Sequence, residues 1–138
     1  MSQTLYQRIG ERAGLEALLA EFYAQAQLDP VIGPIFQRHV HDWPSHLATV
    51  TDFWSTQTGG PPLYRGGMGR HIRLGLEAQH FEHWLALWGR VTRERLDAES
   101  AEALLAIARM VAGRLAEMAA GAYGVRIAST PSSDARSS

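Results

Sequence analysis

With 138 residues and a hydrophobic fraction of 46%, the chain suits one compact domain with a single core, and two independent domains are not expected. The formal net charge is −1 and the 13 Lys and Arg residues are dispersed, which argues against nucleic acid or an anionic membrane as a partner. Cysteine is absent, so disulfides, iron–sulfur clusters and thiolate metal sites are excluded, and any metal must be held by His or carboxylate side chains.

Neither a membrane span nor a secretory signal is visible in the sequence. No apolar stretch approaches the length that crosses a bilayer, and Met1-Ser2-Gln3-Thr4 does not open a basic-then-apolar pattern. We therefore expect a soluble, cytoplasmic protein, either a monomer or a weak oligomer.

The first helix is predicted from apolar residues that recur every three or four positions. They are Leu15, Leu18, Leu19, Phe22, Tyr23 and Ala26. Asp29-Pro30 ends this helix, because the residue before a proline disfavours the helical conformation. Over residues 31–36 only a short turn is expected.

A second helix is predicted to begin at Asp42-Trp43-Pro44, where the proline falls in the first turn and its missing N–H costs nothing. One imidazole, that of His46, shares a stripe with Val50 and Phe53 on this helix. The helix is expected to end at Gly59-Gly60-Pro61-Pro62, and a glycine-rich connection follows.

Two more helices are predicted in the C-terminal half. The first runs from about residue 78 to 96, and the second is capped by Asp97 and ends near Gly121 and Gly124. Since no two-residue alternation occurs, the fold class is all-α. We expect one domain over residues 1–127, followed by a polar, disordered tail over residues 128–138.

His71 is the most informative residue of the chain. It follows Gly66-Gly67-Met68-Gly69-Arg70 and precedes Ile72 and Leu74, between two helices rich in aromatic residues. An isolated imidazole at the edge of an apolar slot is what a haem iron needs as an axial ligand. The alternative is a surface histidine on a flexible turn.

Other interpretations of these residues are open at this point. Glu77-x-x-His80 has the spacing of di-iron carboxylate bundles, although no second copy of the motif appears. A small zinc site could use His80 with His83, or His39 with His41. The aromatic stripes could also be an ordinary core or a partner groove in a cofactor-free helical binding module.

Taken together, the sequence resembles the truncated, two-on-two haemoglobins, most closely their third group. The resemblance runs in order from about residue 5 to residue 120 and rests on short stretches: Glu21-Phe22-Tyr23, Gly33-Pro34-Ile35-Phe36, Trp43-x-x-His46, Asp52-Phe53-Trp54, the connection from Tyr64 to His71, and Phe81-x-x-Trp84-Leu85-x-Leu87. One departure is Gly59-Gly60-Pro61-Pro62-Leu63-Tyr64, which is more similar to the second group.

The resemblance implies a globin-like, two-over-two helical sandwich that holds haem b through His71. It implies that Tyr23 and Trp84 are distal hydrogen-bond donors to the bound ligand, and that His46 is a distal gate. The cofactor-binding positions that it implies, including donors to the haem propionates, are Phe36, Val50, Phe53, Trp54, Tyr64, Arg70, Arg73, Leu74 and Phe81.

The implied activity is reversible binding of O2, NO and CO. Two strong distal donors slow oxygen release, which suits redox chemistry such as nitric oxide dioxygenation or a peroxidase-like reaction better than oxygen transport. The resemblance also implies a reductase as partner.

Overall fold

The computed structural model describes residues 3–64 and 76–129 of the chain, and within these ranges it contains six helices and no strand. The helices are α1 (Leu5–Arg8), α2 (Glu11–Ala26), α3 (Gly33–His39), α4 (Trp43–Gln57), α6 (Ala78–Arg95) and α7 (Ala98–Ser129). The expected all-α fold is confirmed.

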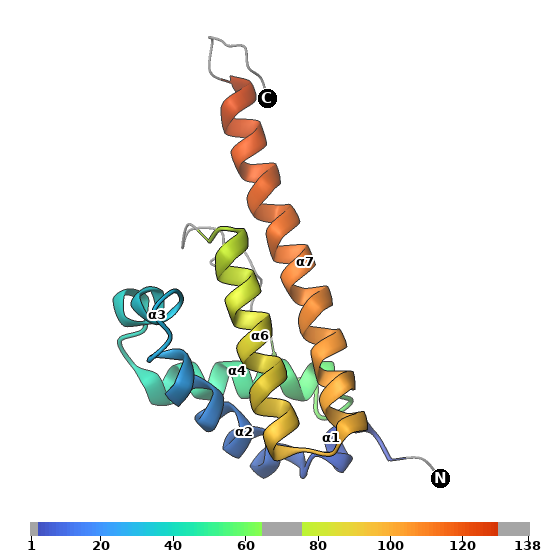
Figure 1. The fold of residues 1–138 in the computed structure, drawn as a ribbon. Helices are drawn as coiled ribbons and strands as arrows, with labels where there is room; N and C mark the ends of the chain where they lie inside the picture. Colours follow the sequence, from blue (N-terminus) through green and yellow to red (C-terminus); the bar gives the residue numbers. More distant parts are fainter. Residues whose placement is uncertain (1–2, 65–75, 130–138) are drawn as a thin grey trace.

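The helices are arranged as two packed pairs. α6 lies along α7, α2 packs against α4, and α2 also packs against α6, so that one pair rests on the other (Figure 1). The short α1 contacts both α2 and α7. This is the two-over-two arrangement that the resemblance implied.

Two helix starts follow the local chemistry that the sequence predicted. The Asp42 carboxylate accepts a hydrogen bond from the Ser45 N–H at 3.2 Å where α4 begins, and the Asp97 carboxylate accepts one from the Ser100 N–H at 2.9 Å where α7 begins. α4 ends as predicted, with Gly59 at φ +92° directly beyond its last turn.

The α2–α3 connection differs from the prediction. Instead of a short turn over residues 31–36, the chain forms α3, because the Asp29 carboxylate accepts hydrogen bonds from the N–H groups of Val31 and Ile32 at 2.7 and 3.0 Å. Gly33 lets α3 approach the end of α2: a Cβ at this position would lie 2.5 Å from the Gln27 carbonyl oxygen. α3 is thereby held against α2.

The first and the last helix also differ from the prediction. α1 was not expected, since four residues are too few to show a helical period. α7 runs through Gly121 and Gly124 to Ser129, and Figure 1 shows it projecting beyond the other helices.

The core lies where α2, α6 and α7 meet. Its largest side chains with almost no exposed surface are Trp88, Phe22, Leu15, Leu18, Leu19 and Leu104. The Trp88 indole N–H donates to the Leu104 carbonyl at 3.2 Å, and the Thr92 hydroxyl donates to the Trp88 carbonyl at 2.8 Å. These bonds satisfy the indole N–H of Trp88 and the hydroxyl of Thr92 inside a largely apolar core.

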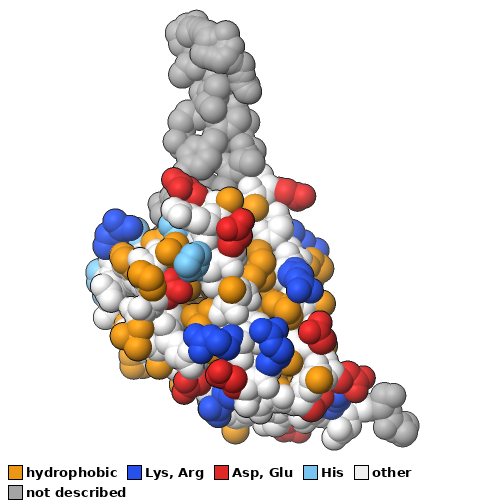
Figure 2. Space-filling view, in the orientation of Figure 1, with side chains coloured by type: hydrophobic (Ala, Val, Ile, Leu, Met, Phe, Trp, Pro, Cys, Tyr) orange, Lys and Arg blue, Asp and Glu red, His pale blue; other side chains and the backbone are white. Residues whose placement is uncertain are grey.

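The surface carries charges of both signs. Acidic and basic side chains are interspersed on the face shown in Figure 2. Pairs such as Arg12 with Asp52 at 2.9 Å and Arg8 with Asp97 at 3.2 Å join helices that are distant in the sequence. Among the helices of the described ranges, none combines the length and the apolar character needed to cross a membrane.

Candidate functional site

A cavity of about 450 Å³ lies among α2, α3, α4, α6 and α7. Its volume falls within the range of about 300–1,000 Å³ that is typical of small-molecule sites. Every predicted cofactor-binding residue within the described ranges lines it: Phe36, Val50, Phe53, Trp54, Tyr64 and Phe81. The described lining residues include no Asp, Glu, Lys or Arg, so the cavity is suited to a ligand that is largely apolar.

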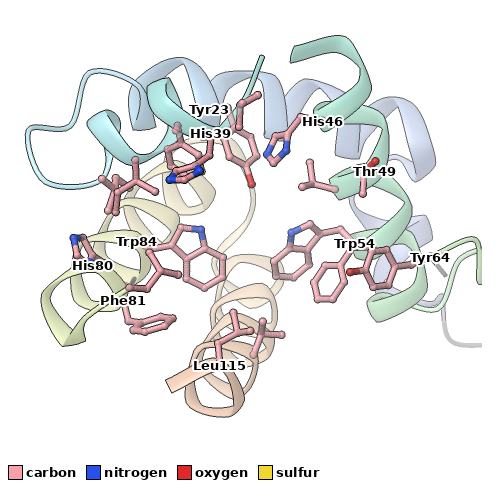
Figure 3. A pocket seen from close by; sticks show the side chains of 18 residues that line it. Tyr23, His39, His46, Thr49, Trp54, Tyr64, His80, Phe81, Trp84 and Leu115 are labelled. Carbon is pink, nitrogen blue, oxygen red and sulfur yellow. The ribbon is translucent and has the colours of Figure 1, made fainter. Parts of the chain in front are cut away.

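The three predicted distal residues meet at this cavity. Tyr23 comes from the last turns of α2, His46 from the first turn of α4 and Trp84 from α6, and all three line the same space. The Tyr23 and His46 rings meet edge to face, with centroids 5.1 Å apart. Figure 3 shows the Tyr23 hydroxyl pointing into the cavity, between the indoles of Trp84 and Trp54.

Tyr23 is held as a proton donor by its surroundings. The residue is only 8% exposed, and this burial raises the pKa of its phenol far above the usual value, because the charged phenolate is poorly solvated there. The ring is fixed by edge-to-face contact with Phe36 at 5.4 Å and by a tilted contact with Trp43 at 5.8 Å. A neutral hydroxyl therefore faces the cavity, and the aromatic contacts hold its ring in place.

The predicted axial ligand cannot be placed in this geometry. His71, together with the predicted cofactor-binding residues Arg70, Arg73 and Leu74, lies outside the residues that the structure describes. Their assignments stay predictions.

The family of the chain follows from its match to known proteins. The family model for bacterial-like globins matches residues 4–116, which is most of the chain. The chain is a bacterial-like globin. No curated protein matches it closely enough to count as a relative.

Solved structures place this globin among the truncated haemoglobins. The group III truncated haemoglobin from Campylobacter jejuni has 27% sequence identity and a TM-score of 0.71, and the similarity covers 78% of this chain and 90% of that one. The group II proteins from Agrobacterium tumefaciens (24% identity, TM-score 0.71, 83% and 94% covered) and Bacillus anthracis (21%, 0.72, 83% and 92%) share the fold. The resemblance to this family is confirmed, and haem-based binding of small ligands follows from it.

Haem is the group that membership in this globin family implies, and the described residues fit it. A porphyrin is flat and largely apolar, and the cavity offers aromatic side chains from four helices without an Asp, Glu, Lys or Arg among its described lining residues. The Tyr23 hydroxyl and the Trp84 indole face the cavity (Figure 3). Further polar side chains also line it: His39, His46, Thr49, Tyr64 and His80. The cavity is a largely apolar slot that offers hydrogen-bonding groups to a bound ligand.

Several lining residues of the globin were not predicted. They are Ile32, Ile35, His39, Val40, Thr49, Leu76, His80, Val111 and Leu115. Val111 and Leu115 are spaced one helical turn apart in the last predicted helix, but this apolar stripe alone does not show whether it faces a cavity or the core. Ile35 lies on α3 and His39 and Val40 lie at its end, where the sequence predicted no helix and only a short turn over residues 31–36.

The alternative metal sites receive no support from the geometry. Among the described residues, no group of three or more His, Cys, Asp or Glu side chains could hold a metal ion. The His80 Nδ1 accepts a hydrogen bond from the Glu77 N–H at 2.7 Å at the start of α6, and the His83 Nδ1 lies 3.4 Å from an Asp29 carboxylate oxygen. These histidines serve a helix start and a contact between α6 and the α2–α3 connection.

Proposed function

We propose that the chain is a haem b protein that binds O2, NO and CO and uses them in redox chemistry, with nitric oxide dioxygenation or peroxide reduction as its activity. The observation that carries the proposal is the meeting of Tyr23, His46 and Trp84 at one apolar cavity. When bound there, haem supplies an iron that takes up a diatomic ligand and exchanges electrons with it.

Different residues of the chain would ligate the iron, enclose the ring and bind the propionates of this cofactor. His71 is proposed to hold the iron from the proximal side. Phe36, Phe53 and Phe81 would enclose the ring and exclude water, since all three line the cavity. We propose Tyr64, Arg70 and Arg73 as the donors to the propionates, and Val50, Trp54 and Leu74 as further packing positions.

The distal donors set the rate of ligand release. The Tyr23 hydroxyl and the Trp84 indole N–H face the space where a ligand with partial negative charge would sit (Figure 3). A charge-assisted hydrogen bond contributes about 1.5–3 kcal/mol, which corresponds to about a 10- to 150-fold slower release. A site that retains oxygen this strongly supports redox chemistry over transport. His46 lines the same space and would control access to it.

One optical experiment tests the cofactor and its ligation. Spectra of the ferric, ferrous and CO-bound protein should show a haem with one histidine ligand, and His71→Ala should lose that spectrum. His80→Ala is the matched control, because His80 lines the cavity but is not the proposed ligand. A colourless protein would favour the cofactor-free helical module, and an unchanged spectrum in His71→Ala would refute the ligand.

The redox activity is tested separately. Mixing the oxygenated protein with NO should give nitrate in equimolar yield, or the ferric protein should consume peroxide in the presence of a reducing dye. A reductase belongs to this proposal, since either reaction consumes electrons. A protein that releases oxygen rapidly and performs neither reaction would be a carrier instead.

A further inference from the structure

Three of the four tryptophans form a parallel group that we call the tryptophan stack: Trp54, Trp84 and Trp88. The ring centroids of Trp54 and Trp88 are 4.6 Å apart with an interplanar angle of 19°, and those of Trp84 and Trp88 are 6.5 Å apart with an angle of 11°. Trp54 and Trp84 line the cavity, and Trp88 joins them from within the core. The stack therefore connects two walls of the proposed haem site through a buried indole.

The near-parallel geometry of the tryptophan stack differs from that of the aromatic pairs around it. The neighbouring pairs Phe22–Trp88 and Tyr23–Phe36 meet edge to face, with interplanar angles of 79° and 88°, which is a favourable geometry for aromatic rings in a core. The near-parallel indoles of Trp54 and Trp88, 4.6 Å apart, overlap their π-systems, whereas Trp84 and Trp88 are parallel but farther apart, at 6.5 Å. Such overlap lets a positive charge on one ring be shared with the next.

Trp88 is in a suitable place to hold that charge. It is 1% exposed, and its indole N–H donates to the Leu104 carbonyl at 3.2 Å. An amide carbonyl accepts a hydrogen bond but is too weak a base to remove the proton, so an oxidised Trp88 would remain a cation. A cation is stabilised by the face of an adjacent indole, and Trp54 presents its face to Trp88.

We propose that the tryptophan stack donates electrons to hydrogen peroxide that is reduced at the haem site. This proposal rests on the proposed function. In the balanced step, two indoles each give up one electron by way of the haem and become radical cations. Hydrogen peroxide accepts these two electrons and two protons from solvent, its O–O bond breaks, and two water molecules form.

Tyr23 is the competing electron donor at the same cavity. Oxidation of a phenol at neutral pH requires the loss of its proton, and the burial that raises the pKa of Tyr23 opposes that loss. An indole can be oxidised without losing its proton. The tryptophan stack and Tyr23 therefore have separate roles, the first as electron donor and the second as hydrogen-bond donor.

The test uses the haem-loaded ferric protein mixed with an equimolar amount of hydrogen peroxide and frozen rapidly for electron paramagnetic resonance. Protein grown with ring-deuterated tryptophan should give a narrowed radical spectrum, and protein grown with ring-deuterated tyrosine should not. This measurement on the unmodified sequence does not depend on whether any variant folds. A radical that responds only to tyrosine labelling overturns the proposal.

Two variants locate the radical. Trp88→Phe separates Trp54 from Trp84, so the tryptophan signal should be lost and peptide mass spectrometry should find oxidation at Tyr23 instead. Trp43→Phe is the matched control, since Trp43 is outside the stack and does not line the cavity, and it should keep the signal. Equal signals in both variants would overturn the role of Trp88.

The failure of this proposal is distinguishable from failure of the proposed function. Absence of a haem spectrum before peroxide is added overturns the proposed function and the role of the stack with it. A normal haem spectrum followed by a tyrosyl radical alone overturns only the role of the stack. A normal haem spectrum followed by no reaction with peroxide overturns the role of the stack and peroxide reduction together, but leaves ligand binding and nitric oxide dioxygenation standing.

Discussion

Phe22 and Tyr23 are adjacent in the sequence but belong to two different regions of the molecule. Phe22 faces the core, where it is 1% exposed and meets Trp88 edge to face at 5.1 Å. Tyr23 faces the cavity beside His46. In the core the Trp88 N–H is paired with a backbone carbonyl, whereas in the cavity the Tyr23 hydroxyl is directed at the space where a ligand would bind (Figure 3).

From this comparison we expect substitutions in the core to affect stability and substitutions at the cavity to affect ligand binding. In the core the Trp88 N–H joins α6 to α7 through the Leu104 carbonyl, so the loss of this bond should weaken the fold. If the polar groups at the cavity serve a ligand, as we propose, their loss should change the kinetics of that ligand while the fold persists. Substitutions in each region, and at the contacts between them, test this division.

The largest effect is expected in the core. Leu104→Ala should lower the free energy of unfolding by about 2–5 kcal/mol, because it removes a fully buried side chain and leaves a cavity. Urea unfolding measures the loss. Met110→Ala on the same helix is the control, since Met110 is 46% exposed and its truncation should cost less than about 0.5 kcal/mol. Equal losses would show that α7 is not packed as described.

The second effect is expected at the cavity. Tyr23→Phe should speed oxygen dissociation by about 10- to 150-fold, since it removes one charge-assisted hydrogen bond of about 1.5–3 kcal/mol. The melting temperature should change little. Stopped-flow displacement of oxygen by CO measures the rate, with Tyr6→Phe on α1 as the control. If neither Tyr23→Phe nor Trp84→Phe changes the rate, these residues are not the distal donors.

The third effect concerns the close contact of α3 with α2. Gly33→Ala should destabilise the protein by about 1–3 kcal/mol, because the new Cβ would lie 2.5 Å from a backbone oxygen and α3 would have to shift. Gly113→Ala in α7 is the matched control. A Cβ there meets nothing within 4 Å, so the helix should gain about 0.5–1 kcal/mol. Thermal unfolding of the two variants should shift in opposite directions, and a shared direction would contradict the contact.

Gly33→Ala also tests whether a change in stability and a change at the cavity occur together. Phe36 lies on α3 and lines the cavity, so a displaced α3 should weaken haem retention as well as stability. Transfer of haem to apomyoglobin measures this retention. An unchanged transfer rate in a destabilised variant would show that α3 can move without disturbing the cavity.

The smallest effect is expected at Asp29. Partial burial raises the pKa of its carboxyl group, but hydrogen bonds from the N–H groups of Ile32 and Val31 and the nearby His83 outweigh this and lower the pKa below its usual value. The ionised carboxylate therefore stabilises the fold above the unfolded pKa of about 3.9, and this stabilisation is lost as the pH falls through the folded pKa.

Asp29→Asn keeps an oxygen acceptor for the start of α3 but removes the charge. At neutral pH it should cost less than about 1 kcal/mol, and its difference from the original protein should shrink as the pH falls below about 4. Urea unfolding at a series of pH values measures the difference. Glu117→Gln, at an exposed position of α7, should show no such trend. A difference independent of pH would rule out the charge as its cause.

Much of the fold could be predicted because its signals are local. Asp42 and Pro44 mark the start of α4, Gly59 marks its end, and Asp97 marks the start of α7 within the distance of one helical turn. α3 escaped prediction because its start depends on a side chain, that of Asp29, which bonds two backbone groups in the folded connection.

The resemblance named residues that line the cavity, whereas lining residues that depend on packing alone were not predicted. The roles assigned to the named residues stay predictions. Tyr23, His46 and Trp84 lie on three helices, and their periodicity marks them as apolar-face residues without showing that they meet. Val111 and Leu115 show the reverse case: their stripe was visible, but the cavity that they face exists only after α7 has packed. Both cases depend on tertiary contacts between helices, which a short stretch of sequence does not reveal.

Because Phe22 faces the core and the adjacent Tyr23 faces the cavity, the rotation of α2 about its own axis is fixed. Successive residues of an α-helix differ by about 100° around its axis, so deleting one residue early in α2 would turn both rings away from their neighbours together. Insertions and deletions should therefore be tolerated before α2 or after Ala26 far better than within it. A shift of this helix turn would therefore disturb the core and the cavity at the same time.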